Sequence, residues 1–165
     1  MSFLSQYSSL DLSIARLIFA QVHRAAWRSN PEIVRLLLRA GANLTMKNDE
    51  GQTPLIKFAS SLNRVCVYNA DAEDLDPRVQ VLWMLITADA DVDAVDAKHQ
   101  TALHAVALCS EDYTKQPRRI EAAKLLLAAG LALEAADSDG RTALDIFIKQ
   151  EDYEMVGLLS SYIHG

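Results

Sequence analysis

The sequence contains few cysteines and few glycines, and neither residue type is arranged as a cofactor site would require. There are 2 cysteines and 6 glycines in 165 residues. Cys66 and Cys109 have no further cysteine or histidine at metal-ligand spacing, so they predict reduced thiols rather than a metal centre. The glycines form neither Gly-x-Gly-x-x-Gly nor a phosphate-binding loop that ends in lysine. We therefore expect no metal and no other cofactor.

Basic residues are also in the minority, and no long apolar run is present. Lys and Arg number 16 against 22 Asp and Glu, which gives a formal net charge of −6. A negative surface repels a phosphate backbone, so direct binding of nucleic acid is not expected. The apolar stretch 10–20 is broken by Asp11 and Arg16, and no stretch approaches the roughly 18 apolar residues of a membrane span. These features predict a non-secreted protein of the cytoplasm or nucleus, without a membrane segment.

Apolar residues are abundant, and they recur in a helix-end motif. Hydrophobic residues make up 50% of the chain and charged residues 23%, which at this length favours a single folded domain. Three segments share an apolar triplet followed by alanine and then by Gly or Asp, where a left-handed residue would end a helix. The residues at these three helix ends are Gly41, Asp89 and Gly130.

A helix-start motif recurs at the same intervals. Gly51-Gln-Thr-Pro-Leu55, His99-Gln-Thr-Ala-Leu103 and Gly140-Arg-Thr-Ala-Leu144 each place Thr where it can cap a helix, with Pro or Ala in the first turn. Successive copies of both motifs are 48 and then 41 positions apart. A common unit of 33 residues explains both intervals if the second copy carries 15 extra residues and the third carries 8. These insertions are expected between the two helices of their units, at 62–77 and 110–117.

Together these motifs resemble the ankyrin repeat, a unit of one β-turn finger and two antiparallel helices. The resemblance also includes His23-Arg-Ala-Ala26 and Glu32-Ile-Val-Arg-Leu-Leu-Leu38 in the first copy, and Thr101-Ala-Leu-His104 in the third. It implies an all-α fold, a solenoid of stacked helix-turn-helix units with short β-turn fingers. In four helix pairs we expect eight or nine helices.

The resemblance divides the chain into an end segment and one repeat domain. Residues 1–16 are expected to form a helical extension or cap, and residues 17–165 a single domain. Its approximate repeats are 17–46, 47–93 with the 15-residue insertion, 94–134 with the 8-residue insertion, and 135–165.

Residues with catalytic chemistry form no recognisable catalytic set. The sequence lacks His-Glu-x-x-His and Gly-x-Ser-x-Gly. Cys109 and His104 are five positions apart, but no third group is evident that would orient them. His23 and His104 occupy the histidine position of the repeat motif, where the resemblance implies a hydrogen bond to neighbouring backbone. We assign no catalytic residue and favour a non-enzymatic role.

Two acidic segments are interpreted as loops rather than as cation sites. Residues 68–77 hold four carboxylates but lack the glycine and the ligand spacing of a calcium loop. Asp137-Ser-Asp-Gly140 begins like an EF-hand loop, but Ile148 stands where that motif needs a bidentate glutamate. We expect a solvated loop in the first segment and a finger turn in the second.

The resemblance implies that the chain binds another protein through a concave surface, built from the fingers and the exposed side of each first helix. We expect a monomer. The residues expected to contact the partner are Trp27, Arg28, Asp49, Glu50, Gln52, Ser60, Ser61, Lys98, Gln100, Leu108, Arg141 and Lys149.

The two tryptophans are expected to have different roles. Trp27 is favoured as a partner contact because Trp and Arg often dominate binding energy, and packing against the N-terminal helix is the alternative. Trp83 falls on a second helix and is expected to pack beneath the 15-residue insertion.

Two other functions stay open at this point. The chain could be an enzyme or small-molecule-binding protein that uses the insertions as pocket walls, or a structural subunit whose ends stack on copies of itself. An enclosed apolar pocket with convergent polar groups near Cys66, Cys109 or His104 would favour the pocket hypothesis.

Overall fold

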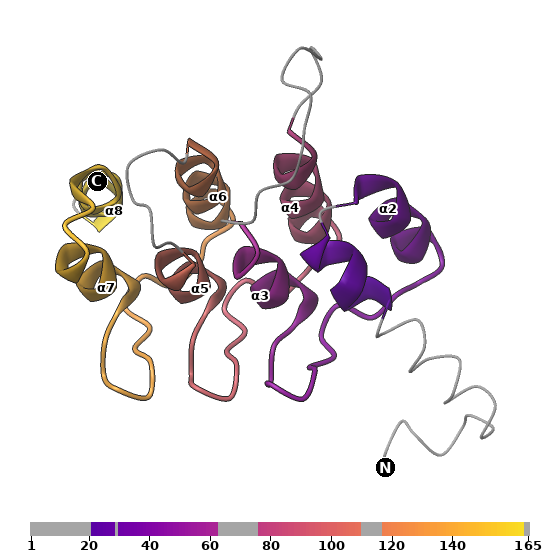
Figure 1. Ribbon diagram of the computed structural model, residues 1–165, viewed down its shortest axis with the longest axis horizontal. Helices are drawn as coiled ribbons and strands as arrows, with labels where there is room; N and C mark the ends of the chain where they lie inside the picture. Colours follow the sequence, from indigo (N-terminus) through magenta and orange to yellow (C-terminus); the bar gives the residue numbers. More distant parts are fainter. Residues whose placement is uncertain (1–20, 29, 63–75, 110–116, 164–165) are drawn as a thin grey trace.

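The computed structural model of the chain consists of helix pairs that repeat side by side along one axis (Figure 1). It describes residues 21–28, 30–62, 76–109 and 117–163. Residues 21–27 are helical. The helices that follow are α2 (Pro31–Arg39), α3 (Pro54–Ala59), α4 (Pro77–Thr87), α5 (Ala102–Leu108), α6 (Pro117–Ala128), α7 (Ala143–Lys149) and α8 (Tyr153–Ile163).

The helices form two rows, with the fingers extending from one of them (Figure 1). The inner row contains residues 21–27, α3, α5 and α7, and the outer row contains α2, α4, α6 and α8. Neighbours pack along the rows, α3 on α5 and α5 on α7, α2 on α4 and α4 on α6. The described residues contain no strand, only an isolated bridge between Ala136 and Thr142 in the last finger. The all-α solenoid expected from the sequence is confirmed.

The two insertions lie where the repeat spacing predicts them. One separates the end of α3 at Ala59 from the start of α4 at Pro77, and the other separates the end of α5 at Leu108 from the start of α6 at Pro117. Most of both insertions, Cys66 and the predicted N-terminal extension 1–16 fall outside the described residues.

Threonine begins the inner helices, as the helix-start motif predicts. Thr53, Thr101 and Thr142 are the N-caps of α3, α5 and α7. Thr53 Oγ1 accepts a hydrogen bond from the Ile56 amide at 3.4 Å, and Thr142 Oγ1 accepts one from the Asp145 amide at 3.2 Å. Each bond satisfies one of the amides that a helix start leaves without an intrahelical partner.

Three of the outer helices, α2, α4 and α6, end at left-handed residues, as the helix-end motif predicts. The φ angles of Gly41, Asp89 and Gly130 are 74°, 57° and 87°. The amide of each donates to a carbonyl three residues back, at Leu38, Ile86 and Leu127, with distances of 3.0, 3.2 and 3.0 Å. Asp89 therefore adopts the backbone of a glycine cap, at the steric cost that a Cβ brings there.

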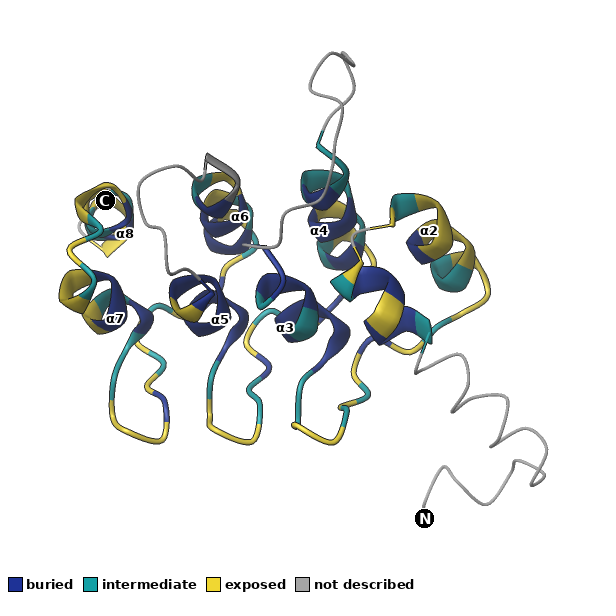
Figure 2. Ribbon diagram, in the orientation of Figure 1, coloured by how far each residue is buried: buried dark blue, intermediate teal, exposed yellow. Residues whose placement is uncertain are grey.

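The core lies between the two rows and runs through all the units (Figure 2). Its largest buried side chains include Phe58, Leu85, Leu126 and Phe147. Alanines with no exposed surface, Ala26, Ala59 and Ala107, occupy the same position in three successive inner helices. Small residues there let neighbouring units approach closely, which places consecutive fingers next to each other.

Candidate protein-binding surface

One Asx residue organises each finger turn. Asn48, Asp96 and Asp137 occupy the same position, and the amide of each donates to the carbonyl four residues later at 2.8 to 3.0 Å. The side-chain Oδ1 of each accepts two further bonds, from the amides two and four residues later. The turn expected at 137–140 is confirmed. The recurrence of Asx three residues before the Gly or His of the helix-start motif signals this role, which the sequence reasoning missed.

Consecutive fingers are also bonded to each other through their backbones. The Ala97 amide donates to Glu50 O at 3.2 Å, and the Ser138 amide donates to Lys98 O at 2.9 Å. These bonds fix the spacing of the turns, so the side chains at their tips form one row rather than three independent loops.

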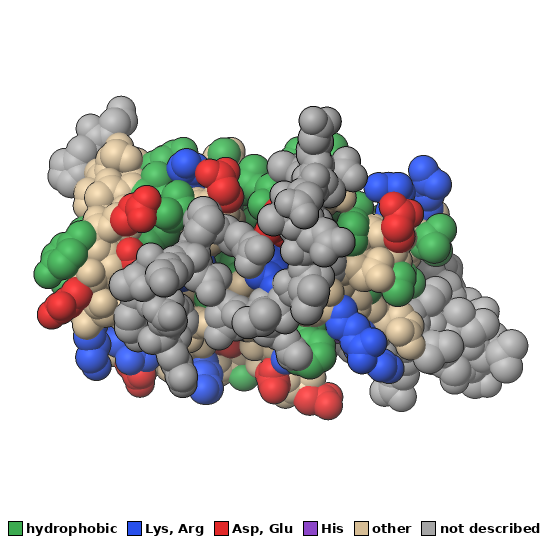
Figure 3. Space-filling model, turned by 45° about the horizontal axis from the view of Figure 1, so that its top comes forward, with side chains coloured by type: hydrophobic (Ala, Val, Ile, Leu, Met, Phe, Trp, Pro, Cys, Tyr) green, Lys and Arg blue, Asp and Glu red, His purple; other side chains and the backbone are tan. Residues whose placement is uncertain are grey.

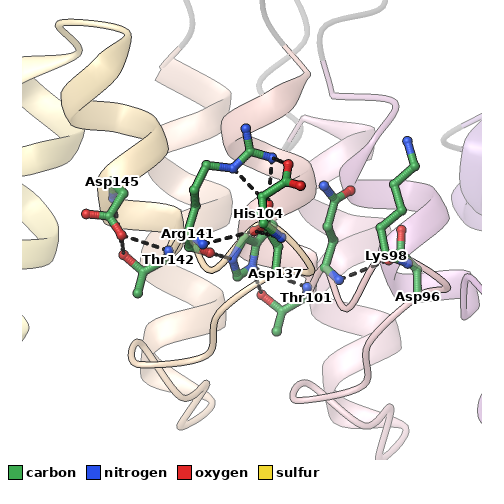
Figure 4. Close-up of polar contacts among 10 residues, drawn as sticks. Asp96, Lys98, Thr101, His104, Asp137, Arg141, Thr142 and Asp145 are labelled. Atoms are coloured by element: carbon green, nitrogen blue, oxygen red, sulfur yellow. Dashed lines mark hydrogen bonds and ion pairs between the residues drawn. The ribbon is translucent and has the colours of Figure 1, made fainter.

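A buried histidine connects each of two inner helices to the following finger. His23 Nε2 lies 2.9 Å from Gln52 O. His104 Nε2 lies 3.0 Å from Arg141 O, as Figure 4 shows. The Thr101 amide donates to His104 Nδ1 at 3.3 Å, so Nδ1 is an acceptor and Nε2 carries the proton. The backbone hydrogen bond implied by the resemblance is confirmed at both histidines.

The last finger contains a buried carboxylate paired with arginine (Figure 4). Asp137 Oδ2 accepts from Arg141 Nε at 3.1 Å and from Nη2 at 2.8 Å. Arg141 Nη2 also lies 2.7 Å from Asp139 Oδ2. The hydrogen bonds from the Arg141 side chain, more than those from backbone amides, lower the pKa of Asp137 to about 2. Arg141 is thus held in place by the finger that presents it.

The inner helices present one face toward the fingers. Lys57 on α3 reaches back to the second finger, where its Nζ lies 3.2 Å from Glu50 Oε2. One turn further along this face is Ser60, and the same position is Leu108 on α5 and Lys149 on α7. Leu108 is 45% exposed and presents apolar area on this face. Lys57 was not among the predicted contacts, although its position one turn before Ser60 could have indicated it.

The twelve predicted contact residues differ in how far they are exposed. Exposed are Arg28, Asp49, Glu50, Lys98, Leu108 and Lys149; half-buried are Trp27, Gln52, Ser60, Gln100 and Arg141. Ser61 is buried and donates through Oγ to Phe58 O at 2.6 Å, so its side chain is engaged inside the fold. We call the surface formed by six of these and neighbouring residues the finger surface: Glu50, Lys57, Lys98, Leu108, Arg141 and Lys149.

The burial predicted for Trp83 is wrong. Its side chain is 56% exposed on α4, whereas we expected it to pack beneath the 15-residue insertion. The reason is its place in the outer helix, because Trp83 is equivalent to Arg35 on α2 and Lys124 on α6, which are also exposed.

Within the described ranges, no group of three His, Cys, Asp or Glu side chains is placed to hold a metal ion. The Cys109 thiol is buried and donates to Val106 O at 3.1 Å. Over the same ranges, no helix has the length and apolar character that crossing a membrane would need.

Comparison with known proteins gives two matches. The ankyrin repeat family model matches residues 22–49, which span the first helix pair and the start of the following finger. The nuclear factor NF-kappa-B p105 subunit of Gallus gallus is 27% identical over 139 residues, which cover 84% of this chain and 12% of that protein. The chain therefore spans a small part of the length of this relative. Both matches agree with the repeat found in the sequence.

Proposed function

We propose that this chain, an ankyrin-repeat protein, is an interaction module that binds a partner protein across its finger surface. Ankyrin repeats are in general protein-binding modules. The observation that supports this surface is the backbone bonding between consecutive fingers, from Ala97 to Glu50 and from Ser138 to Lys98. A surface ordered in this way loses little conformational freedom on binding, which favours affinity.

The side chains of the finger surface also suit a protein partner. Leu108 offers exposed apolar area, and Lys98 and Lys149 are exposed charges in neighbouring units. An apolar contact surrounded by charges is the usual anatomy of a protein interface, in which the apolar centre contributes affinity and the rim contributes steering.

The test uses two exposed apolar residues on opposite rows as a matched pair. Leu108→Ser changes the finger surface, and Trp83→Ser changes the outer row. A partner captured from native cells with the wild-type chain, then purified, should lose about 1 to 3 kcal/mol of binding free energy with Leu108→Ser in calorimetry. Trp83→Ser should bind it as the wild type does.

A second variant tests the charged part of the finger surface. Lys98→Glu should lower the association rate more at low salt than at high salt, because rim charges act through steering. If Trp83→Ser abolished binding while Leu108→Ser and Lys98→Glu had no effect, the partner would bind the outer helices and the proposal would fail.

We propose the cytoplasm or nucleus as the location, in line with the sequence prediction and with the similarity to a protein named as a nuclear factor subunit. Microscopy of a fluorescent fusion in native cells tests this, and a signal confined to another compartment would contradict it.

A further inference from the structure

The outer face of α2 exposes apolar side chains at a position that the later units bury. Ile33 lies eight residues before the helix end at Gly41, and Val81 and Ala122 lie eight before Asp89 and Gly130; Met155 is one 33-residue unit after Ala122. Ile33 is 46% exposed, whereas Val81, Ala122 and Met155 are 0%, 2% and 1% exposed.

A second position of α2 repeats this contrast. Leu36 is 62% exposed, whereas its equivalents Met84, Leu125 and Leu158 are half-buried. In this row α4 packs on α2 and α6 packs on α4, so α4 and α6 each have a neighbour in the preceding unit, and we infer that these positions face it. Among the described residues, α2 has no preceding unit (Figure 1).

The inner helix of the same unit carries an exposed charge at Arg24. The equivalent residues of the later units are Lys57, which is half-buried, and Ala105 and Ile146, which are buried. A terminal repeat needs a polar outer face in water. Among the described residues of this unit, the large apolar side chains that are exposed, Ile33 and Leu36, both lie on α2.

Charged side chains flank this apolar surface. Their order along α2 would be complementary to the same order on a second α2 that runs antiparallel to it. Glu32, Leu36 and Arg39 are spaced i, i+4 and i+7, so they lie along one stripe of α2, with the acid near the helix start and the base near its end. All three are exposed. Figure 3 shows apolar, acidic and basic side chains together at this end of the molecule.

We propose that α2 packs antiparallel against α2 of a second copy of this chain, to form a homodimer. A two-fold axis near Leu36 then places Glu32 of each copy opposite Arg39 of the other, with the apolar side chains between them. Such an interface is isologous, because the same patch serves on both copies. Antiparallel helices also bring unlike ends of the two helix dipoles together.

The size of α2 predicts a weak dimer. Its nine residues span about 13.5 Å at about 1.5 Å per residue, so the buried area falls below the roughly 800 Å² per partner of a standard interface. We therefore expect a monomer–dimer equilibrium that depends on concentration. This replaces the monomer expected from the sequence, because the sequence could not show that this face of α2 is exposed.

The experiment uses charge reversal in the full-length chain, followed by sedimentation velocity over a concentration series at low salt. The wild type should dimerise, and Glu32→Arg and Arg39→Glu should each weaken the dimer by at least about tenfold, because like charges then face each other twice. Mixing the two variants should give a heterodimer with affinity near that of the wild type. The double variant should dimerise with itself.

Two controls complete the test. Leu36→Asp should abolish the dimer, while Ile148→Ser, which changes an exposed isoleucine on α7, should leave it intact. Circular dichroism checks that all variants remain folded. A wild type that stays monomeric at every concentration would overturn the proposal and point to residues 1–20 as the cover of α2. A dimer that Glu32→Arg, Arg39→Glu and Leu36→Asp leave unchanged would overturn it too, and neither result bears on the finger surface.

Discussion

Replacing Asp137 by Asn separates two roles of one carboxylate in the last finger. The Asn side chain retains Oδ1, which accepts from the amides two and four residues later, as Asn48 does in the second finger at 3.0 and 2.8 Å. The substitution removes the negative charge that Arg141 Nε and Nη2 contact. Asp137→Asn should therefore keep the turn and lose the ion pair.

The magnitude follows from the pKa of Asp137. Hydrogen bonds from the Arg141 side chain, followed by those from backbone amides, lower this pKa from 3.8 to about 2. One pKa unit corresponds to about 1.4 kcal/mol, so the charged form contributes about 2 kcal/mol to the free energy of unfolding near neutral pH. Because Asp137 is buried, solvent screens this interaction less than it would screen a surface pair.

The direction of the pKa shift determines how the stability contribution of Asp137 changes with pH. A carboxyl group whose pKa is lowered by folding contributes stability above its unfolded pKa of 3.8, and that contribution is lost as the pH falls through the folded pKa of about 2. In urea denaturation followed by circular dichroism, Asp137→Asn should cost about 2 kcal/mol at pH 7. The difference from the wild type should shrink toward zero as the pH approaches 2.

The control is Asp139→Asn, because Asp139 also contacts Arg141 but is exposed. An exposed ion pair contributes about 0 to 1 kcal/mol, so this variant should change stability little at any pH. The reasoning would be refuted if Asp137→Asn were as stable as the wild type at pH 7, or if its deficit stayed the same at pH 3.

Three further changes test the backbone and the histidine link. Asp89→Gly should raise the free energy of unfolding by about 1 kcal/mol, since φ is 57° there and glycine removes the Cβ cost; a lower urea midpoint would contradict this. Gly51→Ala should lower the free energy of unfolding more than Gly140→Ala. The backbone cost is similar at both sites, where φ is 75° and 76°, but only a Cβ at 51 would lie 2.6 Å from the Ala97 amide nitrogen. Equal losses in urea denaturation would contradict the close approach. His104→Ala should cost about 2 to 4 kcal/mol by the same assay, because it leaves a buried carbonyl unpaired and a cavity behind; a loss under 1 kcal/mol would show that the link is dispensable.

Repeat spacing made the scaffold predictable. A left-handed residue is needed once per outer helix and a cap once per inner helix, so the same residue types return at fixed intervals, and Thr53, Thr142, Gly41 and Asp89 could all be placed. His104 could be assigned a structural role because its motif position fixes what lies beside it. These features are determined within one unit or by the contact between a unit and the next.

Burial against other units or insertions was less predictable. Trp83 is exposed because its helix position faces solvent in every unit compared, which the apolar character of the side chain conceals. Ser61 was taken for a surface residue although it is buried beside the end of α3. Ile33 is exposed because no helix among the described residues lies beside this face of α2. Sequence periodicity could not show this, since it predicts the same burial for every unit.

The fingers combine a common backbone with different side chains, and this division explains how one scaffold can select a partner. The Asx bonds and the left-handed residues at Gly51, His99 and Gly140 fix the same turn three times. The exposed tips then differ in charge, with Glu50 on the second unit and Lys98 on the third. In the fourth, Asp139 lies against Arg141, which reduces the net charge presented there. A partner that lies across the fingers therefore meets an acidic and then a basic tip at a spacing set by the backbone bonds between them. If the proposed binding surface is correct, we expect its specificity to come from the order of those charges, because the backbone that presents them is the same in all three fingers.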